Sequence, residues 1–75
     1  MLNSRTIKPI GKIAHLIKLL IAFGNKEYTD SASQKFVDIV DKLSFYNSAN
    51  NVWKDAFDEM NCLLEELQKK INPLC

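Results

Sequence analysis

The sequence predicts an all-α fold, a small three-helix bundle, and three observations lead to this class. Apolar residues recur at helical spacing in three segments, which the polar stretches NKEYTD and NSANN separate. The 75 residues include only two glycines and two prolines, and 47% of them are hydrophobic. A chain of this length buries about 60–65% of the surface of its unfolded form. We therefore expect one helical domain, residues 1–75, of marginal stability as a monomer.

The first helix is expected over residues 9–23, within the segment KPIGKIAHLIKLLIAFGN. Pro9 suits the first turn of a helix, where its missing donor would be unpaired anyway, and Gly24 with Asn25 supplies a stop. On a helical wheel the apolar side chains fill about 180°, which is broader than one neighbouring helix needs. The polar side chains gather in a narrower band, called here the lysine stripe: Lys8, Lys12, His15 and Lys18.

The second helix is expected over residues 31–45, where one side is apolar and the other is charged. The sequence SASQ at its start has the pattern of a capping box, in which the Ser31 hydroxyl and the Gln34 side chain satisfy backbone amides.

The third helix is expected over residues 51–72, with Pro73 as its stop. Ser48, Asn50 or Asn51 could each cap its start. Within it, two acid-before-base pairs are spaced for weak ion pairs, Glu65 with Lys69 and Glu66 with Lys70.

Charge is segregated along the chain, although the net charge is only +1. Residues 1–26 carry five cations and no acid, whereas residues 27–75 carry all nine acids and five lysines. The small net charge argues against strong, general attraction to nucleic acid. Two interpretations remain open: the basic segment neutralises the acidic one within the fold, or it presents a basic surface to an acidic partner.

Lys18 interrupts the apolar run of the first helix, which excludes a membrane-spanning segment and argues against a secretion signal. The first helix is nevertheless basic and amphipathic. Binding to a membrane surface through this helix, and weak nucleic-acid binding through the lysine stripe, therefore remain as alternatives.

Catalytic chemistry is not indicated. His15 has lysines as its charged neighbours and Glu27 as its nearest acid in sequence, so no group is placed to orient it as a base. Acids surround Cys62 and make it a poor nucleophile, while Cys75 ends the chain. These two cysteines suit neither a disulfide scaffold nor a metal site, so we expect free thiols and a reducing, cytoplasmic setting. We expect no enzyme, no cofactor and no metal.

Binding to another protein is the function that we expect, as a small helical regulator, adaptor or inhibitor. The lysine stripe would meet an acidic partner, and an aromatic cluster would make an apolar contact: Phe45, Tyr46 and Trp53.

Unequal helix lengths further predict a homodimer. At 1.5 Å per residue, the first two helices span about 22 Å each and the third about 31 Å, so that the end of the third would need a second subunit to cover it. The apolar residues at that end are the expected contact: Leu64, Leu67, Ile71 and Leu74.

Overall fold

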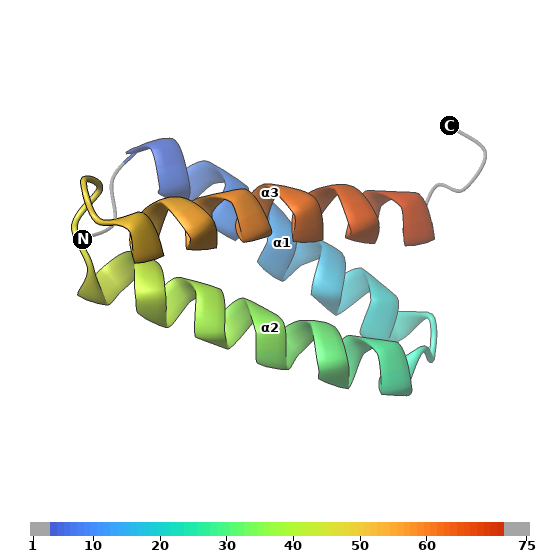
Figure 1. Ribbon diagram of the computed structural model, residues 1–75. Helices are drawn as coiled ribbons and strands as arrows, with labels where there is room; N and C mark the ends of the chain where they lie inside the picture. Colours follow the sequence, from blue (N-terminus) through green and yellow to red (C-terminus); the bar gives the residue numbers. More distant parts are fainter. Residues whose placement is uncertain (1–3, 72–75) are drawn as a thin grey trace.

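The computed structural model describes residues 4–71, which form three helices: α1 (Ser4–Ala22), α2 (Lys26–Phe45) and α3 (Asn51–Ile71). The predicted all-α class and the three-helix bundle are confirmed. The helices run up, down and up, and α1 crosses behind α3 in the view of Figure 1. The bundle measures 37 × 23 × 17 Å.

One hydrophobic core joins the three helices, because each turns an apolar face inward at helical spacing. The lengths of α1, α2 and α3, at 19, 20 and 21 residues, are almost equal, so each helix can cover the others along most of its length. The buried core consists of Ile13, Ile17, Leu20, Ala32, Ile39, Leu43, Trp53, Ala56, Met60, Leu63 and Leu67.

The start predicted for the first helix is wrong, because α1 begins at Ser4 and Pro9 lies inside it. Proline cannot donate a backbone hydrogen bond, so Pro9 weakens the helix locally. Tertiary contacts compensate: Thr6 is fully buried, and the Arg5 guanidinium lies 5.4 Å from the centre of the Phe57 ring on α3. The prediction from local pattern missed these contacts with α3.

The stop predicted at Gly24 and Asn25 is confirmed. Gly24 has a φ of +83°, a left-handed conformation that glycine adopts without steric cost. The Gly24 amide donates to the Ile21 carbonyl at 3.0 Å and the Asn25 amide to the Leu20 carbonyl at 3.2 Å. This pattern of bonds is a Schellman motif, which satisfies carbonyls at the end of α1.

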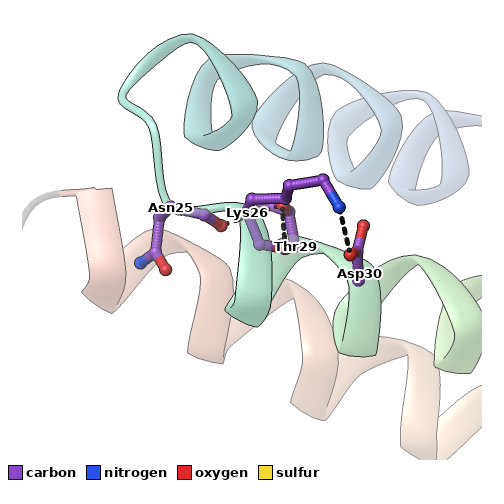
Figure 2. Close-up of polar contacts among 4 residues, drawn as sticks. All are labelled: Asn25, Lys26, Thr29 and Asp30. Carbon is purple, nitrogen blue, oxygen red and sulfur yellow. Dashed lines mark hydrogen bonds and ion pairs between the residues drawn. The ribbon is translucent and has the colours of Figure 1, made fainter.

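The start predicted for the second helix is also wrong, since α2 begins at Lys26 and contains Ser31 and Gln34 in its interior. Figure 2 shows the side chains of Lys26 and Thr29, whose contacts support the earlier start. The Lys26 ammonium lies 3.2 Å from the Asp30 carboxylate, and the buried Thr29 hydroxyl donates to the Asn25 carbonyl at 2.8 Å and the Lys26 carbonyl at 2.9 Å. Because residues 26–30 already form a helical turn, no capping box forms at Ser31.

A short polar loop leads from α2 into α3, and its asparagines accept backbone hydrogen bonds. The Asn47 side chain accepts from the Ala49 amide at 3.0 Å, and the Asn50 side chain accepts from the Val52 amide at 2.8 Å. Asn50 is therefore the cap of α3, one of the three candidates that the sequence offered. The predicted end at Asn72 and the stop at Pro73 lie outside the described residues.

Candidate interaction surfaces

The lysine stripe lies on the outer face of α1. Its four members, Lys8, Lys12, His15 and Lys18, are all exposed. The buried residues of α1, such as Ile13, Ile17 and Leu20, lie on the opposite side of the helical wheel. The stripe therefore lies opposite the core, although Lys12 and His15 border a shallow pocket that Gln68 of α3 also lines.

The lysines of the stripe are not neutralised by the part of the chain that the structure describes. Within residues 4–71, no ion pair links Lys8, Lys12 or Lys18 to a carboxylate. Helix α2 differs, because Lys26 pairs with Asp30 at 3.2 Å and Lys42 with Asp38 at 3.1 Å. The hydrogen bond from Lys42 to Asp38, together with the charge of that carboxylate, raises the pKa of Lys42 above its usual value. The described fold thus pairs charges along α2 and leaves those of the stripe available.

An open groove of about 690 Å³ runs between α2 and α3, and no residue of α1 lines it. Buried Ile39 and Leu63 form its apolar floor. Five acids and two lysines also line it, so its charge is negative. We call it the acidic groove, and its charged residues are Lys35, Asp38, Asp58, Glu59, Glu65, Glu66 and Lys69.

The two ion pairs expected within α3 do not form. No ion pair joins Glu65 to Lys69 or Glu66 to Lys70 in the part of the chain that the structure describes. The Lys70 ammonium instead lies 4.9 Å from the centre of the Tyr28 ring, where it makes a cation–π contact with α2. Burial, and then the negative charge of Glu66, raise the pKa of Tyr28 above its usual value.

The predicted aromatic cluster is split by the fold. The Phe45 and Tyr46 rings lie 5.8 Å apart, and these side chains are 87% and 37% exposed. Trp53 is only 3% exposed and stacks on Phe57 at 5.2 Å, so placing it on a binding surface was wrong. Its position on the wheel of α3 turns it into the core, whereas Phe45 lies at the end of α2 and points outward.

At the end of α3, the described residues pack against the core of their own chain. Leu67 is fully buried, and Leu64 and Ile71 are half-buried against the core of the same chain. The argument from unequal lengths fails because α1 and α2 both begin earlier than predicted. Leu74, the fourth residue of that expected contact, lies outside the described residues.

The apolar arc of α1 is nevertheless broader than its neighbours cover. Ile7 and Ile21 remain 58% and 59% exposed, and Phe23 just beyond the helix is exposed as well. On α2, Val37 is also exposed. The wheel of the first helix predicted more apolar surface than its neighbours could cover, and the structure shows such exposed apolar surface on α1 and α2.

The residues considered for chemistry, His15 and Cys62, lie on different helices, α1 and α3. No group of three His, Cys, Asp or Glu side chains among residues 4–71 could hold a metal ion. His15 is exposed and makes no hydrogen bond or ion pair with another described residue. Cys62 is a free, exposed thiol in the acidic groove, while Cys75 lies outside the described residues.

Sequence reasoning missed the acidic groove, because the acids of α3 looked like an ordinary solvated face. The available signal was the segregation of charge along the chain, which places every acid after residue 26.

Among the helices of residues 4–71, none has the length and apolar character that crossing a membrane requires. No family model, curated protein or solved structure matches this chain.

Proposed function

We propose that this protein is a non-enzymatic interaction module, a small regulator, adaptor or inhibitor, whose binding surface is the outer face of α1. One observation carries the proposal: Lys8, Lys12 and Lys18 are exposed along one helix face and have no carboxylate partner within residues 4–71. The partner is a protein with an acidic surface.

We expect this binding to be selective but of modest affinity. An exposed ion pair contributes about 0–1 kcal/mol, so three lysines cannot give high affinity alone. Complementary charge raises the rate of encounter and disfavours basic partners. The exposed Phe45 and Tyr46 rings add a site for apolar contact near the end of α2.

Capture experiments with matched variants test this proposal. One variant neutralises the stripe (Lys8→Gln, Lys12→Gln, Lys18→Gln), and its control removes the same charge from α2 and α3. The control changes Lys26→Gln, Lys54→Gln and Lys70→Gln, which lie outside the acidic groove. Far-UV circular dichroism verifies that both remain helical, and quantitative mass spectrometry compares the proteins that each variant retains from the native cell.

Proteins retained by the wild type and the control, but lost with the stripe variant, would support the proposal. Identical sets from both variants would show that the binding surface lies elsewhere.

Exposed apolar side chains beside the stripe favour a second candidate, binding to an anionic membrane surface. Ile7 and Ile21 lie on α1 and Phe23 follows it, and basic amphipathic helices bind lipid through such residues. Co-sedimentation with vesicles of anionic and of neutral lipid tests this candidate. Protein that stays in the supernatant with both kinds of vesicle rules it out.

We also propose that the chain self-associates. The support comes from the outer face of α1 and from exposed Ile7, Ile21 and Val37, not from the end of α3. Sedimentation equilibrium tests the proposal, and a constant monomer mass from about 10 μM to about 1 mM would contradict it.

A further inference from the structure

The chain carries two oppositely charged surfaces whose charges are not paired with each other. The lysines of the stripe have no ion-pair partner within residues 4–71, and the same holds for Asp58, Glu59, Glu65 and Glu66 on α3. The stripe lies on the outer face of α1, while the groove between α2 and α3 includes no residue of α1. The two surfaces therefore cannot meet within one molecule.

The lysine stripe and the acidic groove have similar lengths. Lys8 and Lys18 are ten residues apart on α1, or about 15 Å along a helix. The part of α3 that lines the groove extends from Asp58 to Lys69, or about 16 Å. A helix face with the length of the stripe thus fits along the acidic groove, with room for side chains in its volume of about 690 Å³.

Gly11 provides a second, independent observation. Glycine inside a helix costs about 0.5–1 kcal/mol relative to alanine. No packing within the described fold requires this glycine, because a Cβ at Gly11 would meet no other atom within 4 Å. Gly11 lies within the stripe on the wheel, and it lines a shallow hollow together with Lys12, His15, Leu16 and Gln68 of α3. Because glycine has no side chain, another backbone can approach closely at this point.

We propose that the outer face of α1 docks into the acidic groove of a second copy of this chain. The lysines of one copy then face Asp58, Glu59 and Glu65 of the next, and Gly11 lies over the groove. This inference rests on the proposed role of the outer face of α1 and names its partner. Because the two surfaces differ, the contact is head-to-tail, and each dimer keeps one free surface of each kind.

Neutralising variants test the pairing directly. The stripe variant is Lys8→Gln, Lys12→Gln, Lys18→Gln, and the groove variant is Asp58→Asn, Glu59→Gln, Glu65→Gln. A control removes three acids outside the groove, through Glu27→Gln, Asp41→Asn and Asp55→Asn. Sedimentation equilibrium at about 20 mM and about 500 mM salt gives the mass of each variant alone and of mixtures.

We expect the wild type and the control to form species of increasing mass at low salt and to be monomers at high salt. The stripe and groove variants should each associate at least about tenfold more weakly. Their equimolar mixture should form a one-to-one dimer and nothing larger, because each partner keeps a different working surface. A mixture that stays monomeric would overturn the inference, as would association of either variant at wild-type strength.

Gly11→Leu provides a test that does not alter charge. Leucine is a better helix former than glycine, so the fold should persist, whereas its side chain should block the approach and abolish association. Undiminished association of this variant would also overturn the inference. If the stripe variant loses captured proteins but the mixture forms no dimer, the proposed function stands and only the self-contact is wrong. If the mixture forms the dimer but the stripe variant captures the same cellular proteins as the wild type, the self-contact stands and the proposed outside partner is wrong.

Discussion

Helices α1 and α2 are almost equal in length and pack antiparallel, but they differ in where their stability comes from. Helix α2 has local support: Glu27 lies in its first turn, Lys42 in its last, and two ion pairs span single turns. Helix α1 has no acid in its first turn and no base in its last, and it contains both Pro9 and Gly11. Helix α1 must therefore depend on tertiary packing.

This difference separates charges that stabilise the fold from charges that are free to bind. The charges of α2 form pairs along the helix itself. On α1, Lys8, Lys12 and Lys18 form no ion pair with an acid in residues 4–71. Folding therefore does not account for these exposed lysines on the outer face of α1, which agrees with the proposed binding role of that face.

The largest expected effect tests the dependence of α1 on the core. Ile13 is fully buried, and Ile13→Ala should lower the free energy of unfolding by about 2–5 kcal/mol. Chemical denaturation followed by circular dichroism measures the change, and Ile13→Val, at about 1 kcal/mol, provides a milder variant if the first does not fold. The matched control, Ile21→Ala on the exposed side of α1, should stay within about 0.5 kcal/mol. Equal losses at Ile13 and Ile21 would contradict the packing.

A smaller effect, of opposite sign, is expected at Pro9. Pro9→Ala restores an amide that can donate within α1, so it should raise the free energy of unfolding by about 1–2 kcal/mol. Thermal unfolding should show an increase in Tm of about 4–8 °C for each kcal/mol. A lower Tm would mean that the proline ring packs in a way that the helix requires.

Local support of α2 can be weakened by about 1 kcal/mol. Thr29→Val removes a buried hydroxyl that donates to two backbone carbonyls. The free energy of unfolding should therefore fall by about 1 kcal/mol, the usual contribution of such a hydrogen bond. Ser31→Ala should change the free energy of unfolding by less than about 0.5 kcal/mol, because Ser31 lies inside the helix. A loss of about 1 kcal/mol at Ser31 would instead indicate that it caps the helix.

The smallest effect concerns pH at the start of α2. The folded-state pKa of Tyr28 is above the ordinary 10.0, so the folded protein holds the phenol proton more tightly than the unfolded chain does. The resulting stability is complete below pH 10.0 and decreases as the pH rises through the folded-state pKa. Tyr28→Phe should reduce this alkaline loss in denaturation curves. A Tyr28 ionisation that coincides with that of free tyrosine would contradict the shift.

Local pattern predicted those parts of the fold that local chemistry controls. The three amphipathic segments, the stop at Gly24 and the start of α3 beside Asn50 depend on side-chain periodicity and on hydrogen bonds between close neighbours. The starts of α1 and α2 could not be predicted in this way. Arg5 lies over Phe57 of α3, and Lys70 of α3 lies over Tyr28, so each start is stabilised by residues far away in sequence.

The candidate surfaces were predicted in part. The periodicity of α1 was enough to place Lys8, Lys12, His15 and Lys18 on one exposed face. It was not enough to separate exposed Phe45 from buried Trp53, because both are aromatic residues near the same loop. The acidic groove requires α2 and α3 side by side, so no single segment could reveal it.

By itself, the sequence determined that the chain is helical, where two of its turns lie, and that positive charge precedes negative charge along it. The tertiary structure alone decided whether those charges meet. Coulomb interactions between exposed groups are weak beyond a few ångströms in water, so partners must be adjacent in space and not merely present in the same chain. Packing the apolar face of α1 inward turned its lysines away from the acids of α3, and this arrangement left both surfaces available for binding.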